Sequence, residues 1–201
     1  MNAQTASRVR KDITPSFETV KTLFQQGDLV PVYRRLLADL ETPVSVYMKL
    51  AQAGEYSFLL ESVEGGEQVG RYSFLGVNPR GIITVEGYTI KRVVDGEETK
   101  RELAAGEDPL DVVKAELTAF TPVPVEGLPR LVGGAVGYIG YDVVRYFERL
   151  PETASRDLDV PDLAFLLPDT LVVFDHAKHQ LIVLANAHNT GNPESAYHDA
   201  V

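Results

Sequence analysis

Apolar residues recur at helical spacing near the start of the chain. Phe17, Val20 and Phe24 lie three or four positions apart, which places them on one face of a helix. Ser16 is a residue type that caps helix starts, and Gly27 follows the last apolar position, as glycine often does past a helix end. The pattern predicts a short amphipathic helix between these two residues.

Two later segments carry the same kind of signal. Residues 42–54 begin with Thr-Pro, end with glycine and place Val46, Leu50 and Ala53 on one side. Residues 108–120 begin with Asp-Pro and continue with apolar residues at helical spacing. Proline suits the first turn of a helix and glycine its end. We therefore predict a helix in each segment, with the first one facing the core.

Runs of alternating or β-branched apolar residues indicate strands in much of the remaining chain. The predicted strands are residues 30–36, 56–62, 70–77, 81–85 and 88–94, with a hairpin formed by 171–174 and 181–184. Short turns join strands that are antiparallel neighbours. Strands in runs with a few helices between them predict an α+β fold, in which antiparallel sheets pack against a few helices.

The segments between these elements are predicted as connections. Residues 121–130 hold three prolines and are expected to cross the surface. After Gly133, small residues predict a strand that passes into a helix ending at Pro151. A second loop is expected to follow, through Pro161.

The two ends of the chain differ from its middle. Residues 1–14 are polar and lack apolar periodicity, so we predict a flexible lead-in. Residues 15–190 hold the predicted elements and are expected to form one domain. Within residues 191–201, Asn-Pro-Glu starts a helix that the sequence does not finish. We expect the protein to continue past it.

Composition narrows the class of protein. The formal net charge is −10, with 19 Lys and Arg against 29 Asp and Glu, whereas a nucleic-acid surface needs a basic stripe. No apolar run is long enough for a membrane helix, and the first residues lack the apolar stretch of a secretion signal. The absence of cysteine excludes disulfides, thiolate metal sites and cysteine nucleophiles. We expect a cytoplasmic protein with small-molecule or protein partners.

The strand predicted over 56–62 carries the candidate binding residues. Period-2 alternation places Ser62 at the end of an apolar face, where its hydroxyl could bind the polar head of an amino acid. Glu61 offers a carboxylate for an ammonium group. Arg71 on the next strand either meets a ligand carboxylate or pairs with Glu61 across the sheet. From these residues alone, the simpler interpretation is that Ser62 and Glu61 solvate a strand end.

Other chemical signals are weaker. The glycines at 133, 134, 137 and 140 match no phosphate-binding loop, and close packing of a buried strand explains them better. Asp175, His176 and His179 could bind a metal only with ligands from another element, so solvated turn residues are the favoured interpretation. No pair of carboxylates stands out as a general acid and base. The residues alone identify no catalytic site and no metal site.

Four stretches stand out when they are read in order. They are PVYRRLLADLETPVSVYMKL, FLLESVEGG, GRYSFLGVNPR and GGAVGYIGYDVVRYFERLP. Together they resemble the amino-terminal domain of anthranilate synthase component I, the large subunit of that enzyme. Their order and spacing are more specific than any single stretch, and LLES followed by RYSFLG is the most telling pair. The resemblance covers roughly residues 15–190.

This resemblance implies an activity, a cofactor and a partner. Such enzymes convert chorismate and ammonia to anthranilate and pyruvate with Mg²⁺, in tryptophan biosynthesis, and a glutamine amidotransferase subunit supplies the ammonia. The chorismate and magnesium site of the family lies in a carboxy-terminal domain whose motifs are absent from these 201 residues. The chain by itself is therefore expected to be a catalytically incomplete part of a lyase, with no catalytic residue of its own.

The resemblance also implies regulation. In the family, the amino-terminal domain binds L-tryptophan as an allosteric feedback inhibitor, and the residue carried over is Ser62, with Glu61 and Arg71 as further candidates. The catalytic domain supplies part of that pocket, so inhibition would bias how the two domains are arranged. Residues 191–201 would then begin the helix that leads into the catalytic domain.

Three other interpretations stay open. Aminodeoxychorismate synthase component I, a folate-pathway enzyme of the same fold, has a similar amino-terminal domain. A non-catalytic module for amino-acid binding or subunit docking could use the same sheet. A third interpretation is that the region contacts the amidotransferase subunit through Tyr138, Tyr141 or Phe147. Core burial of these three aromatic residues is the simpler explanation.

Overall fold

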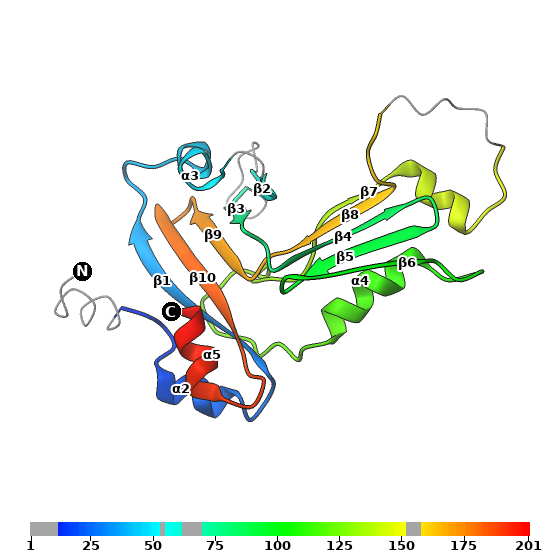
Figure 1. Cartoon of the computed structure of the whole chain (residues 1–201). Helices are drawn as coiled ribbons and strands as arrows, with labels where there is room; N and C mark the ends of the chain where they lie inside the picture. Colours follow the sequence, from blue (N-terminus) through cyan, green and yellow to red (C-terminus); the bar gives the residue numbers. More distant parts are fainter. Residues whose placement is uncertain (1–11, 53–54, 62–69, 152–157) are drawn as a thin grey trace. The chain divides into compact units, whose positions relative to one another are not determined.

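The computed structural model describes residues 12–52, 55–61, 70–151 and 158–201. Within them the chain forms two five-stranded sheets and a few short helices (Figure 1). All pairings between the named strands are antiparallel, which confirms the predicted α+β class. Two compact units divide the chain: the first comprises residues up to 78, 120–133 and from 169 on, and the second comprises 79–119 and 134–168.

The sheet of the first unit has the strand order β1-β10-β9-β3-β2. Its strands are β1 (Leu29–Leu37), β2 (Ser57–Leu60), β3 (Tyr72–Val77), β9 (Thr170–Asp175) and β10 (Gln180–His188). The predicted hairpin is confirmed as β9 and β10, which pair from Asp175 opposite Gln180 to Thr170 opposite Ala185. The predicted strand over 56–62 is shorter than expected and ends at Leu60.

Both faces of this sheet are covered. On one side the buried residues are Tyr33, Leu171, Val173, Ile182 and Leu184, and the proline-rich crossing packs against them. On the other side, helix α3 (Pro43–Leu50) packs against a cluster of Leu75, Val172, Phe174 and Leu181. Burying apolar side chains on both faces is the main source of stability for such a layer.

Among the residues that the structure describes, the first unit has three helices, and polar caps define their starts. In α2 (Phe17–Leu23), the Ser16 side chain accepts a hydrogen bond from the Thr19 amide, as its position predicted. Thr42 forms a capping box at the start of α3, and Asn192 caps α5 (Pro193–Ala200). The predicted end of α3 at Ala53 and Gly54 was wrong, because the helix ends at Leu50 and its C-cap, Ala51, is extended; Ala53 and Gly54 themselves lie outside the described residues.

The second unit contains the sheet β6-β5-β4-β8-β7. Its elements are β4 (Gly81–Glu86), β5 (Thr89–Val94), β6 (Glu97–Glu102), α4 (Pro109–Thr118), β7 (Val136–Ile139), a 3₁₀ helix η1 (Tyr141–Tyr146) and β8 (Leu163–Leu167). Asp108 caps α4 by accepting from the Leu110 amide at 2.8 Å, as predicted. The core of this unit includes Ile83, Val85, Val113 and Leu163.

Three predictions for the second unit were wrong. The helix expected to end at Pro151 is a 3₁₀ helix that ends at Tyr146. β7 is an edge strand with one half-buried and three exposed residues, so the glycines there do not mark a buried strand. Core burial of the nearby aromatic residues is also contradicted, because Tyr138, Tyr141 and Phe147 are 43%, 88% and 55% exposed.

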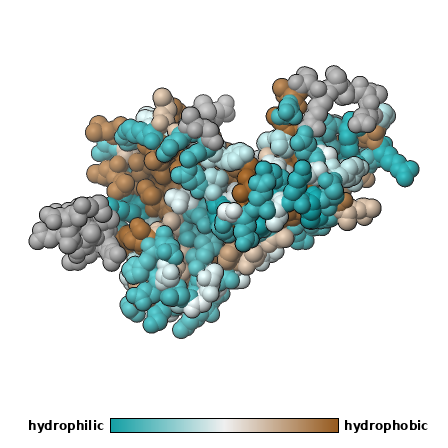
Figure 2. Space-filling model, viewed as in Figure 1, coloured by the Kyte–Doolittle hydropathy of each residue, from teal (hydrophilic) through white to brown (hydrophobic). Residues whose placement is uncertain are grey.

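The first unit also exposes apolar side chains. Leu37, Leu40, Val44 and Met48 lie around the end of β1 and along α3, and each is at least 46% exposed. Figure 2 shows hydrophobic colouring over this end of the unit, whereas α2 and α5 are mostly hydrophilic on the side seen. None of the helices in the described parts of the chain has the length and apolar character that a bilayer crossing requires.

Candidate functional site

The candidate site lies where β2 pairs with β3, because this pairing brings together the two motifs that stood out in the sequence. Leu59 lies opposite Leu75, and Leu60 opposite Phe74. Gly76 lies opposite Phe58, and a Cβ at Gly76 would overlap the Phe58 ring. The glycine of the RYSFLG motif is therefore needed for close packing of β2 on β3.

Glu61 directly follows the last residue of β2 and is exposed. Its carboxylate is thus accessible at the end of an edge strand. Ser62, the other candidate of this strand, lies outside the described residues. Leu60, the last residue of β2, is 44% exposed and offers apolar surface at this strand end, and Tyr56, which precedes the other end of β2, is 59% exposed.

Arg71 lies just before β3 and binds a carboxylate that the sequence did not pair with it. Its Nε donates to Oδ1 of Asp175 at 3.0 Å, and its Nη2 donates to Oδ2 at 2.8 Å. The guanidinium also lies over the Tyr72 ring, 4.8 Å from the centroid. The partner of Arg71 is therefore Asp175 at the end of β9 and not Glu61.

The Arg71–Asp175 pair is partly buried, with 4% of the Asp175 side chain and 33% of the Arg71 side chain exposed. Burial acts to raise the pKa of Asp175, but hydrogen bonding and the charge of Arg71 outweigh it, and the net pKa is lowered. The hydrogen bonds to Asp175 raise the pKa of Arg71. Both groups are therefore ionised at neutral pH.

A second side-chain contact fixes the same corner of the sheet. The Ser73 hydroxyl lies 2.8 Å from Nε2 of His176, and the His176 ring stacks on Phe174. Ser73 is fully buried. Of the three residues weighed as metal ligands, Asp175 binds Arg71 and His176 contacts Ser73, whereas His179 is an exposed turn residue with a φ of 50°.

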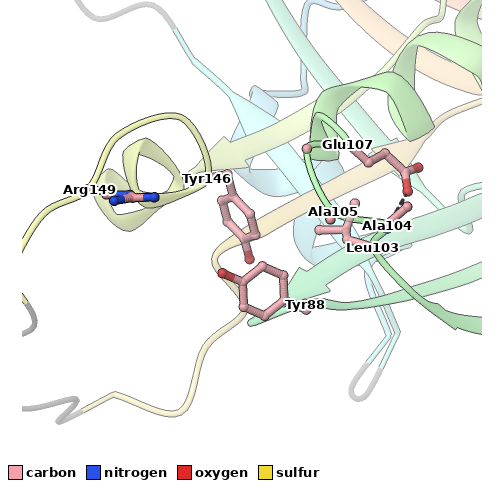
Figure 3. A pocket seen from close by; sticks show the side chains of 8 residues that line it. Tyr88, Leu103, Ala104, Ala105, Glu107, Tyr146 and Arg149 are labelled. Carbon is pink, nitrogen blue, oxygen red and sulfur yellow. Dashed lines mark hydrogen bonds between the residues drawn. The ribbon is translucent and has the colours of Figure 1, made fainter.

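The second unit holds a surface hollow of about 610 Å³ that the sequence did not indicate (Figure 3). Its lining residues come from separate segments of the chain and are Tyr88, Leu103, Ala104, Ala105, Gly106, Glu107, Tyr146 and Arg149. The two tyrosine rings meet edge to face with centroids 5.9 Å apart. The Tyr146 hydroxyl lies within hydrogen-bond reach of two acceptors, the Gly87 carbonyl and Oδ2 of Asp162. These bonds give the tyrosines a structural role within the unit.

Comparison with known proteins places the chain in a family. A family model described as chorismate binding enzyme matches residues 55–201. Anthranilate synthase component 1 of Acetivibrio thermocellus is 36% identical over 93% of this chain and 37% of that protein. The component 1 of Synechocystis sp. is 39% identical over 94% of this chain and 37% of that protein.

Two further matches carry the same name. The component 1 of Pseudomonas aeruginosa is 43% identical over 84% of this chain and 34% of that protein. The crystal structure of anthranilate synthase component I from Streptococcus pneumoniae aligns with a TM-score of 0.49 and 24% identity, over 82% of this chain and 34% of that chain. The chain thus spans little more than a third of the length of these relatives. Because the family model covers most of its length, the chain belongs to the chorismate binding enzyme family, as a homologue of the amino-terminal part of anthranilate synthase component 1.

Proposed function

We propose that this chain is the amino-terminal regulatory part of an anthranilate synthase component I. The full-length protein would convert chorismate and ammonia to anthranilate and pyruvate in the cytoplasm, and L-tryptophan would inhibit it. The names and the 36–43% identity of the relatives support this assignment. The observation that carries the regulatory site is the pairing of β2 with β3, which places Glu61 and Arg71 at the ends of neighbouring strands.

The proposed site recognises an amino acid by its charged head group and its apolar side chain. The exposed carboxylate of Glu61 receives the ligand ammonium, and Arg71 donates to the ligand carboxylate. The Ser62 hydroxyl adds one hydrogen bond to the head group. The indole ring would lie on apolar surface of the kind that Tyr56 and Leu60 expose at β2, since small-molecule sites combine apolar walls with a few polar contacts.

The chemical step belongs elsewhere in the proposed full-length protein. The described residues contain no group of three or more His, Asp or Glu side chains placed to hold a metal ion. We propose that Mg²⁺ and chorismate bind in a part of the protein outside these 201 residues. A glutamine amidotransferase subunit would supply ammonia. The exposed Tyr138, Tyr141 and Phe147 are candidate residues for contacting that subunit.

The test uses the full-length protein with its amidotransferase partner. Anthranilate fluorescence is followed with chorismate, Mg²⁺ and glutamine, with and without L-tryptophan. We expect Glu61→Gln to raise the tryptophan concentration for half-inhibition about tenfold or more, because a hydrogen bond to a charged group is lost. Ser62→Ala should raise it about fivefold, which corresponds to one hydrogen bond of ~1 kcal/mol. Uninhibited turnover should not change in either variant.

The control is Glu55→Gln, which removes an exposed carboxylate before the other end of β2. It should leave tryptophan inhibition unchanged. If the product is aminodeoxychorismate, the protein belongs to the folate-pathway enzymes. If chorismate is not consumed while L-tryptophan still binds, the non-catalytic module is the better description. Anthranilate formation that is equally inhibited in wild type, Glu61→Gln and Ser62→Ala would contradict the proposed site.

A further inference from the structure

Arg71 is held on two sides by residues of its own unit. The carboxylate of Asp175, which is 104 positions away in sequence, accepts from Nε and Nη2. The Tyr72 ring lies against the guanidinium plane. The backbone is fixed at the same point, because the His176 amide donates to the Arg71 carbonyl at 2.9 Å. An arginine bound in this way has few rotamers left.

The two bonds to Asp175 leave part of the guanidinium available. Arginine carries five N–H donors in a planar fork, and Asp175 takes one from Nε and one from Nη2. The remaining donors on Nη1 and Nη2 form a second edge, which can bind another carboxylate with two parallel hydrogen bonds. One third of the Arg71 side chain is exposed, so a ligand can reach it.

We propose that Asp175 and Tyr72 are positioning residues, which orient Arg71 to receive the carboxylate of the amino-acid ligand. This inference rests on the proposed tryptophan site and adds the residues that preorganise it. A pre-oriented arginine binds more tightly because its side-chain freedom is already lost before the ligand arrives. A lysine at the same position could not do this, because its single ammonium group lacks the two planar edges with which a guanidinium binds two carboxylates.

The experiment compares two inhibitors of the full-length enzyme with its amidotransferase partner. L-Tryptophan carries the carboxylate that Arg71 would bind, and tryptamine lacks it. The ratio of their half-inhibition concentrations measures how strongly the enzyme recognises the carboxylate. We expect Asp175→Asn to lower this preference for L-tryptophan about tenfold, because Arg71 loses its charged partner and its fixed orientation.

A second pair of variants tests the same inference without removing a buried charge. Tyr72→Leu removes the ring against Arg71 and should lower the preference for L-tryptophan about threefold, whereas Tyr72→Phe keeps the ring and should preserve the preference. The matched control is Glu107→Gln, which breaks a two-bond Arg–carboxylate pair in the second unit. It should leave the preference as in wild type.

The outcomes separate the inference from the proposed function. In one outcome the wild type is inhibited, and in both Asp175→Asn and Tyr72→Leu the inhibition by L-tryptophan and by tryptamine weakens to the same extent. Asp175 and Tyr72 then have only a structural role, and the inference is overturned. An unchanged preference in both variants overturns it as well, and the proposed function stands in either case. If the wild-type enzyme forms anthranilate and L-tryptophan does not inhibit this activity, the proposed regulation fails. The inference then fails with it.

Discussion

At the residue scale, two Arg–carboxylate pairs show how differently the same contact can arise. Arg101 and Glu107 are six positions apart, and Arg71 and Asp175 are 104 positions apart. The Glu107 carboxylate accepts from Nη1 and Nη2 of Arg101 and from the Ala104 amide. The hydrogen bonds from Arg101, with that amide, lower the pKa of Glu107 from its ordinary value of 4.5 to about 2.

This lowered pKa predicts an acid-dependent contribution to stability. The folded state binds the Glu107 proton more weakly than the unfolded state does, so the contribution is complete above pH 4.5 and is lost as pH falls toward 2. We expect Glu107→Gln to destabilise the protein at pH 7 and to differ progressively less from wild type at pH 4 and pH 3. Urea unfolding at each pH measures this difference.

The control for this prediction is Glu97→Gln, an exposed residue of β6. Its effect on the free energy of unfolding should be small at every pH. A difference between wild type and Glu107→Gln that stays constant from pH 7 to pH 3 would show that the Arg101 pair does not act through the ionised carboxylate.

The residue types of the candidate site could be read from the sequence, but their partners could not. Glu61 and Arg71 were identified because a carboxylate and a guanidinium on predicted neighbouring strands suit an amino-acid ligand. The sequence pattern around Asp175 suggests only a metal ligand. Its contact with Arg71 depends on β3 lying beside β9, and local patterns carry no information about which distant strands pair.

At the element scale, the edge strand β7 depends on a glycine. A Cβ on Gly137 would overlap the Ala164 carbonyl oxygen of β8 and crowd the Phe165 backbone. Backbone atoms cannot rotate away as a side chain can. The predicted close packing is therefore confirmed at Gly137, although the strand is at the sheet edge.

Gly137→Ala should therefore weaken the β7–β8 pairing and reduce the free energy of unfolding by about 2–3 kcal/mol. The comparison is Gly106→Ala, where φ is +81° and nothing lies within 4 Å of the added Cβ. That change should cost only about 1 kcal/mol, from backbone strain. Chemical denaturation of both variants tests whether Gly137→Ala loses more free energy of unfolding than Gly106→Ala. Equal losses would mean that β7 shifts to accommodate the methyl group.

The two strands that sequence analysis missed have different causes. Every residue of β6 is exposed and its sequence, EETKRE, is mostly charged, so it lacks the apolar alternation that marks a strand. The strand conformation of β6 therefore depends on its pairing with β5. β8 reads LAFLL, a short apolar run with no alternation, which is typical of a strand between two neighbours. Such a run is itself a strand signal, so β8 is predictable from local sequence.

At the scale of the whole molecule, the chain passes four times between its two units. The first unit needs β1 to β3 from the start of the chain together with β9 and β10 from its end, whereas all strands and the core of the second unit lie within residues 79–168. The two units therefore differ in how much of the chain each needs to fold.

We expect a fragment of residues 79–168 to fold on its own, since its sheet, α4 and apolar core are complete. A fragment of residues 1–78 should remain unfolded, because β1 and β3 would lack their partners β10 and β9. Amide dispersion in NMR spectra and cooperative thermal unfolding measure this. The proposed difference between the two units would be contradicted if the fragment 1–78 unfolded cooperatively. It would also be contradicted if the fragment 79–168 did not.

The sequence by itself determined the α+β class, most helices and strands, the helix caps and the residue types at the end of β2. These depend on local spacing, capping chemistry and turn residues, which act over a few positions. Only the tertiary structure decided that the strands form two separate sheets, that Asp175 holds Arg71 and that Tyr138, Tyr141 and Phe147 are exposed. These features depend on contacts between residues far apart in the chain, and such contacts form only when distant strands pair.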